Sequence, residues 1–195
     1  MTRASNSFRP PRSIWRGGLA LLPILWLALA ADSAGQSREY AIKAAFLLNF
    51  AQFIQWPASA FANDKAPIVV GVLGDDPFGS VLEQTFQGES VNGRRLVVKR
   101  SHRLDDLKSA NLLFVSQSEK DRVADILGSL KGASVVTISE TPGFAQSGGI
   151  INFYIDDNKI RFEVNLGAAQ RANLQISSQL LERARIVESD AGKDK

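Results

Sequence analysis

The sequence predicts an α/β protein, a three-layer sandwich with a mostly parallel sheet, a C-terminal β-hairpin and flanking helices. Two observations support this fold class. Short, continuous apolar segments alternate with helical segments, which is typical of parallel strands covered on both faces. Farther along, apolar residues alternate singly with polar ones, which indicates an antiparallel pair. The continuous strands predicted in this way are residues 68–73, 96–98, 112–115 and 135–138.

The first thirty residues have the features of a secretory signal peptide. Four arginines and no acidic residue occupy positions 1–18, and an apolar run of 13 residues follows from Leu19 to Ala31. A membrane-spanning helix needs about 20 apolar residues, so this run is too short for an anchor. Small residues at positions 28 and 30 predict cleavage there. We therefore expect residues 1–30 to be removed and the mature protein to lie in the periplasm.

Removal of this peptide changes the charge balance. The whole chain has 23 Lys plus Arg and 20 Asp plus Glu, a net charge of +3. Without the four arginines the balance is 19 against 20, a net charge of −1. The mature chain therefore lacks the basic character that nucleic-acid binding requires, and we expect no nucleic-acid partner.

Residues that could support catalysis or metal binding are scarce. The chain has no cysteine, and His102, its only histidine, lies in a polar connection. Metal sites need clustered ligands, which this sequence does not offer. The segment 146–149 lacks the glycine that precedes the serine of a nucleophile elbow. We therefore expect no enzyme activity, no cofactor and no metal.

Residues 37–188 are expected to form one domain, with a disordered tail at 189–195. The domain begins with a helix from Glu39 to Trp56, in which apolar residues surround nearly the whole helix. Such a helix is either central to the core or contacts a partner. At 100° per residue, two apolar faces adjoin. We expect Phe46, Phe50 and Phe53 to pack inward, and a homodimer contact at Tyr40, Leu47 and Ile54.

A glycine-bounded segment, residues 74–79, follows the first strand. Open α/β sheets place their ligands at such strand ends, although the glycine spacing here does not match a dinucleotide site. Asp76 can cap a helix that starts at Pro77. The alternative is that Asp75 and Asp76 form an acidic recognition site for a cationic ligand or partner. A later helix is predicted from Glu119 to Leu130.

The sequence also predicts how the two strands of the hairpin pair. If Asp157-Asn158 forms the turn, all apolar residues fall on one face, where Phe153 pairs with Phe162 and Ile155 with Ile160. The other face is expected to be exposed, either as a solvated surface or as a polar binding surface. Its residues are Asn152, Tyr154, Arg161, Glu163 and Asn165. A final helix is predicted from Ile176 to Val187.

Several segments together resemble the YfiR-like family of periplasmic regulators. They are residues 43–50 with Trp56-Pro57, 72–79, 148–153, 158–165 and 176–181, in this order over roughly residues 40–187. The resemblance implies a dimeric periplasmic α/β domain that represses an inner-membrane diguanylate cyclase by binding its sensor region, and so controls cyclic di-GMP and biofilm growth. Redox-responsive members of the family use cysteine pairs, and the absence of cysteine here makes thiol-based sensing doubtful.

Two functions follow from these observations. The first is a regulator that binds an inner-membrane sensor protein, either a diguanylate cyclase or a histidine kinase. The alternative is a periplasmic protein that binds a small ligand, whose identity the sequence does not give, and serves a transporter or a sensor kinase. A single domain of this size is too small for two lobes that close on a ligand, which disfavours a transport role.

Overall fold

The computed structural model describes residues 22–188, with side chains from Gly35 onward. Contacts divide the chain into two units, Met1–Gln36 and Ser37–Lys195, and the fold described here is that of the second. Most of the predicted signal peptide (residues 1–30) and all of the predicted tail (residues 189–195) lie outside the described residues. Among the described residues, no helix is both long enough and apolar enough to cross a membrane.

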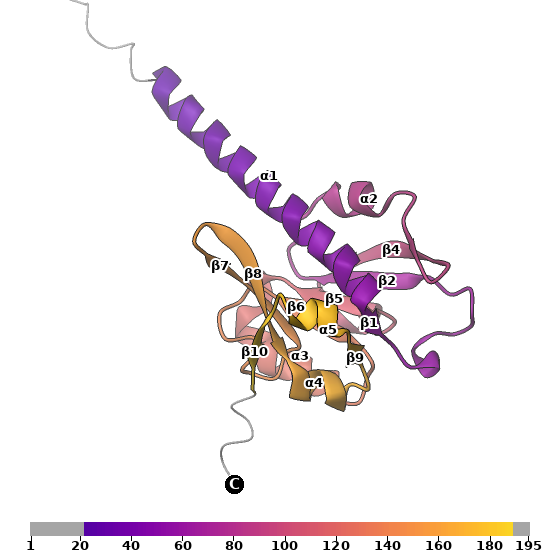
Figure 1. Cartoon of the computed structure of the whole chain (residues 1–195). Coiled ribbons are helices and arrows are strands. Elements are labelled where there is room, and N and C mark those ends of the chain that lie inside the picture. Colours follow the sequence, from indigo (N-terminus) through magenta and orange to yellow (C-terminus); the bar gives the residue numbers. More distant parts are fainter. Residues whose placement is uncertain (1–21, 189–195) are drawn as a thin grey trace, which may run out of the picture. The chain divides into compact units, whose positions relative to one another are not determined.

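An eight-stranded, mostly parallel sheet forms the centre of the fold (Figure 1). Five neighbouring strands are parallel, β8 pairs antiparallel with β7, and β10 pairs parallel with β8. The order is β10-β8-β7-β6-β5-β2-β4-β3. The strands are β2 (Ile68–Leu73), β3 (Ser90–Val91), β4 (Arg94–Ser101), β5 (Leu112–Val115), β6 (Val136–Ser139), β7 (Ile151–Asp156), β8 (Lys159–Asn165) and β10 (Arg185–Val187). The predicted fold class is confirmed.

Two apolar cores lie on opposite faces of this sheet, which makes the fold three-layered. Strand β2 illustrates the division, because Val70 and Val72 contribute to one core and Val69 and Leu73 to the other. The first core also takes side chains from α1 (Leu22–Phe53), α2 (Val81–Phe86), α4 (Leu166–Arg171) and α5 (Ser178–Leu181). The second takes them from η2 (Leu104–Leu107) and α3 (Val123–Ser129).

Helix α1 buries both of its predicted apolar faces. Phe50 is fully buried and Phe46 and Phe53 are partly buried, so the inward position of the aromatic face is confirmed. The prediction that Tyr40, Leu47 and Ile54 form an exposed dimer contact is wrong, because all three are buried in the chain's own core, Leu47 completely. Different segments cover the two faces: the hairpin covers the aromatic face, whereas Phe78 contacts Tyr40 and the chain at Ile176 pairs with Ile54. The helix ends at Phe53 instead of Trp56, and Ile54-Gln55 forms β1, which pairs with β9 (Gln175–Ile176).

The hairpin register is confirmed at every predicted pair. Asp157 and Asn158 both have positive φ, 46° and 58°, as a two-residue hairpin turn of this kind requires. The prediction that the polar face is exposed is only partly right. Arg161 is exposed, but Asn152, Glu163 and Asn165 are buried, because that face is covered near the base of the hairpin by neighbouring chain, including Gln146 and Arg185.

Three helix predictions need correction. Asp76 does not cap a helix at Pro77: its Oδ1 accepts a hydrogen bond from the Phe78 backbone N–H (2.8 Å), and α2 begins later with Ser80 as N-cap. The segment predicted as one helix from Glu119 is a 3₁₀ turn, η3 (Gln117–Arg122), followed by α3. The predicted C-terminal helix is β9, α5 and β10 in succession. Strand pairing with β1 and β8 outweighs the helical periodicity of this segment.

Candidate functional site

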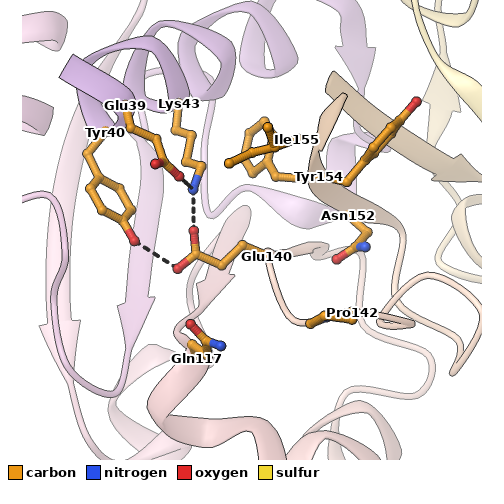
Figure 2. Close-up of a pocket in the computed structure, with 10 residues that line it drawn as sticks. Glu39, Tyr40, Lys43, Gln117, Glu140, Pro142, Asn152, Tyr154 and Ile155 are labelled. Atoms are coloured by element: carbon orange, nitrogen blue, oxygen red, sulfur yellow. Dashed lines mark hydrogen bonds and ion pairs between the residues drawn. The ribbon is translucent and has the colours of Figure 1, made fainter. Parts of the chain in front are cut away.

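The main candidate site lies where the parallel strands end. Strand β7 pairs with β6 only at Ile151 and Asn152, so the hairpin continues past the carboxyl end of β6. A cavity of about 370 Å³ lies beside this overhang, and we call it the carboxyl-edge pocket. Ligands of open α/β sheets bind at this edge. The pocket is lined by Glu39, Tyr40, Lys43, Gln117, Glu140, Pro142, Asn152, Phe153, Tyr154 and Ile155 (Figure 2).

A buried lysine forms part of the pocket wall. Lys43 is only 3% exposed, although it lies on a helix whose neighbouring positions are apolar. Its ammonium forms ion pairs with Glu39, one helical turn earlier, and with Glu140, which follows β6 (Figure 2). It also lies 4.6 Å from the centre of the Tyr40 ring. A buried charge is tolerated only when it is paired in this way.

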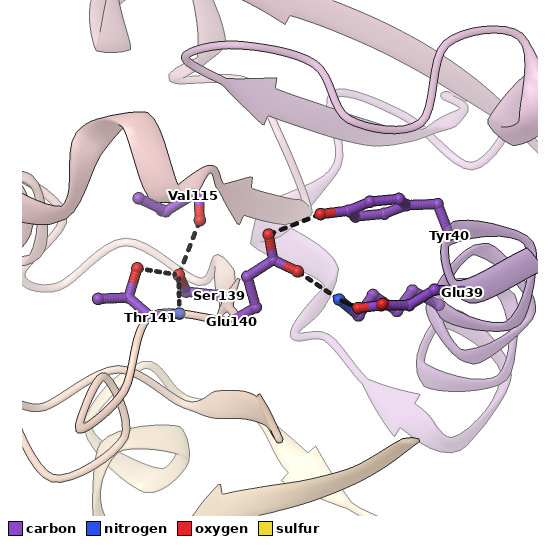
Figure 3. Close-up of polar contacts among 7 residues, drawn as sticks. Glu39, Tyr40, Val115, Ser139, Glu140 and Thr141 are labelled. Carbon is purple, nitrogen blue, oxygen red and sulfur yellow. Dashed lines mark hydrogen bonds and ion pairs between the residues drawn. The ribbon is translucent and has the colours of Figure 1, made fainter. Parts of the chain in front are cut away.

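Tyr40 completes the cluster. Its hydroxyl donates a hydrogen bond to Oε1 of Glu140 (2.9 Å), while the other oxygen of the same carboxylate accepts from Lys43 (Figure 3). Burial, and then the hydrogen bond to Glu140, raise the pKa of the Tyr40 phenol well above its ordinary value. Tyr40 is therefore a neutral donor at physiological pH. We call Glu39, Tyr40, Lys43 and Glu140 the ionic cluster.

The position of Glu140 is fixed by the residues on either side. The Ser139 hydroxyl donates to the carbonyl oxygen of Val115 (2.8 Å) on the neighbouring strand β5, and accepts from the backbone N–H of Thr141 (3.1 Å) (Figure 3). These bonds hold the chain as it leaves β6. The Glu140 side chain can then reach α1, so the cluster ties the first helix to the centre of the sheet.

Four of the predicted binding residues lie at this edge. Tyr154 and Asn152 line the carboxyl-edge pocket itself. Asp75 and Asp76 line a shallower pocket that shares Tyr40, Gln117 and Glu140 with it. Asp75 is exposed, with its carboxylate 4.0 Å from the imidazole of His102, and Asp76 pairs with Arg100 at 2.6 Å.

The other three predicted binding residues lie elsewhere. Arg161 is exposed and pairs with Asp156 (3.1 Å). Glu163 is buried, pairs with Arg185 and accepts a hydrogen bond from Gln146 (2.9 Å). Asn165 is the N-cap of α4, accepting from the Ala168 backbone N–H at 2.8 Å, and its amide also donates to the Ala145 carbonyl oxygen (2.7 Å). Asn165 therefore has a structural role in the fold.

Sequence reasoning did not identify Glu39, Lys43 or Glu140 as site residues. One signal was available for Lys43, which is the only charged residue between Tyr40 and Trp56. A single charge in such a segment either faces solvent or has a buried partner. No local pattern indicated Glu140, because its contact with Lys43 joins residues 97 positions apart.

The carboxyl-edge pocket combines aromatic and apolar walls with amide and carboxylate groups, which suits binding of a small polar molecule. Its charges are already paired with one another. Within residues 22–188, no group of three or more His, Cys, Asp or Glu side chains is placed to hold a metal ion. The paired charges and the apolar walls together form a surface that a small polar molecule could contact.

A family model described as YfiR/HmsC-like matches residues 40–185, from Tyr40 of the ionic cluster to the first residue of β10. No curated protein matches the chain.

Proposed function

Because the chain belongs to the YfiR/HmsC-like family, whose members are periplasmic regulators rather than enzymes, we propose that it binds and represses the sensor region of an inner-membrane diguanylate cyclase. The family match over nearly the whole α/β domain carries this proposal. Release of the cyclase would raise cyclic di-GMP and favour biofilm growth. A sensor histidine kinase is the alternative membrane partner.

Export is part of the proposal. The signal peptide would be cleaved after residue 30 or after Ala34, so that the mature chain begins near Ala31 or Gly35. Mass spectrometry of the protein purified from the periplasmic fraction measures this directly. An intact N-terminus recovered in the membrane pellet would contradict it.

We propose that the partner contacts the tip of the hairpin and the adjacent surface of α1. Ile155 is 63% exposed and Ile42 is 42% exposed, and they are two of the three large apolar side chains exposed among the described residues. The two side chains flank one contact between the helix and the hairpin, in which Phe46 packs against Phe153. Ile42 lies one helical turn before Phe46, and Ile155 lies two residues after Phe153 on the same face of β7. Exposed apolar patches mark interaction sites. A homodimer would also need exposed residues of this kind, since the contact predicted on Leu47 is buried.

The decisive experiment combines co-purification with a cellular readout. The tagged protein is expressed in its host and recovered from detergent-solubilised membranes, and cyclic di-GMP is measured with and without the gene. We expect a membrane diguanylate cyclase to co-purify and cyclic di-GMP to rise on deletion. Recovery of no cyclase together with unchanged cyclic di-GMP would overturn the proposal.

Paired substitutions test the surface. Ile155→Glu should abolish co-purification without changing the thermal midpoint, because an unpaired charge is costly to bury in an interface. Ile186→Glu is the matched control, since Ile186 is 47% exposed on β10. If both variants lose the partner equally, or if neither does, the proposed contact is wrong.

A specific observation favours a second function, the binding of a small periplasmic ligand. The carboxyl-edge pocket lies where such sheets bind ligands, and Tyr154 and Ile155 of the hairpin form part of its wall. A ligand there would contact both the hairpin and α1. The gene neighbourhood separates the functions, because a permease favours transport and a membrane cyclase or kinase favours regulation.

A further inference from the structure

A second cavity lies at the other end of strand β6, where the strand begins. It measures about 410 Å³, within the range of small-molecule sites, and we call it the amino-edge pocket. Its walls come from the end of α3, the chain leading into β6, the chain before β7, and α4. It is distinct from the carboxyl-edge pocket and shares no lining residue with it.

The lining of this pocket is mostly apolar. Leu127 and Leu130 from the end of α3 are only partly buried, and Ala172, just after α4, is partly buried as well. Val135 and Ile150 close the pocket from the sheet and are themselves buried. The space between α3 and α4 thus exposes apolar surface in a concave shape, which an apolar ligand body would cover.

The charges on the lining are of one sign. Lys131 and Arg171 are its only charged residues, and no acidic residue contributes to it. Lys131 follows Leu130, the C-cap residue of α3, and Arg171 is the last residue of α4. An anionic ligand head would therefore meet no acidic side chain on this lining.

The geometry points to a free amphiphilic carboxylate as the ligand of the amino-edge pocket, with an apolar chain between α3 and α4 and its anionic head beside Lys131 and Arg171. The apolar walls favour an alkyl chain, and the two cations favour a ligand whose head group is negatively charged. This inference is independent of the membrane partner, because the pocket lies away from the hairpin tip.

Decanoate is the probe, measured by titration calorimetry on the purified protein below its micelle concentration. We expect one site per chain. Binding should strengthen about fourfold per methylene from hexanoate to decanoate, since each buried methylene adds about 0.8 kcal/mol. Decanol and decyltrimethylammonium share the chain but lack the negative head, and both should bind more weakly than decanoate.

Three variants locate the site. Lys131→Glu should weaken decanoate binding about three- to tenfold, as expected for reversing one partly exposed charge. Lys65→Glu is the matched control, being an exposed lysine outside every pocket described here, and should leave binding unchanged. Ala172→Leu should fill the pocket and abolish binding while the circular dichroism spectrum stays native.

Each of three results would overturn the inference. The protein binds decanoate and decyltrimethylammonium equally, or Lys131→Glu and Lys65→Glu weaken decanoate binding equally. The third is that Ala172→Leu folds and still binds decanoate as tightly as the wild type. Phospholipid vesicles of anionic composition serve as a further arm. Binding to vesicles without binding to decanoate would show that the two cations contact a lipid surface, and would also overturn the inference.

Discussion

Helix α1 makes two different kinds of contact within about three turns. Its Phe46 and Phe50 pack against Phe153 and Phe162 of the hairpin, with ring centres 5.2 to 5.8 Å apart, and we call these four rings the aromatic cluster. One turn earlier, Lys43 joins the ionic cluster with Glu39, Tyr40 and Glu140.

The two clusters differ in what they contribute. Burial of aromatic rings is favourable by itself, and paired rings add about 0.5–1.5 kcal/mol. The attraction between the charges of a buried ion pair barely offsets the cost of removing them from water, so such a pair is weak evidence for stability. We infer that the aromatic cluster holds the hairpin on α1, whereas the ionic cluster sets the geometry of the carboxyl-edge pocket.

The largest effect is expected in the aromatic cluster. Phe162→Ala should lower the free energy of unfolding by about 3–5 kcal/mol, because the ring is almost fully buried and its loss leaves a cavity. Urea unfolding measures this. Ile155→Ala on the same face of the hairpin is the control and should change it by less than about 0.5 kcal/mol, since Ile155 is exposed. Similar losses in both variants would mean that the hairpin is not anchored through its rings.

A smaller effect is expected for Lys43→Met, about 2–4 kcal/mol. The substitution keeps the apolar stem but leaves the carboxylates of Glu39 and Glu140 without their cation. Breaking a fully buried pair costs about 3–5 kcal/mol, and water at the partly exposed Glu39 reduces this.

The double variant Lys43→Met/Glu140→Gln should recover part of the loss, as expected for residues that act together. Lys108→Met is the control, because the ion pair between Lys108 and Asp105 is exposed. A double variant less stable than Lys43→Met would show that Glu140 stabilises the fold through contacts other than its ion pair with Lys43.

The smallest effect is expected for Tyr40→Phe, about 1 kcal/mol at pH 8, because only the hydrogen bond to Glu140 is lost. The folded-state pKa of Tyr40 is raised above its unfolded value near 10. The stability linked to this shift is fully present below pH 10 and is lost as the pH rises toward the raised pKa. The difference between wild type and Tyr40→Phe should therefore shrink above pH 10. A constant difference up to pH 11 would contradict this.

The hairpin shows how far local sequence can be trusted. Its turn and all its cross-strand pairs follow from the alternation of apolar residues around Asp157-Asn158. The exposure of its second face does not follow, because Glu163 is covered by Gln146 and Arg185, which lie 17 and 22 positions away. The candidate site shows the same limit: Tyr154 and Asn152 were identified from the hairpin pattern, whereas Lys43 and Glu140 were not.

The sequence by itself determined the four parallel strands β2, β4, β5 and β6, the hairpin register and the inward aromatic face of α1, because each depends on the pattern of apolar residues within one segment. Only the tertiary structure decided which polar residues are buried and where the last helix gives way to strands β9 and β10. Those outcomes depend on partners distant in sequence, such as Glu140 for Lys43 and β8 for β10. A pattern within one segment carries no information about what will be packed against it.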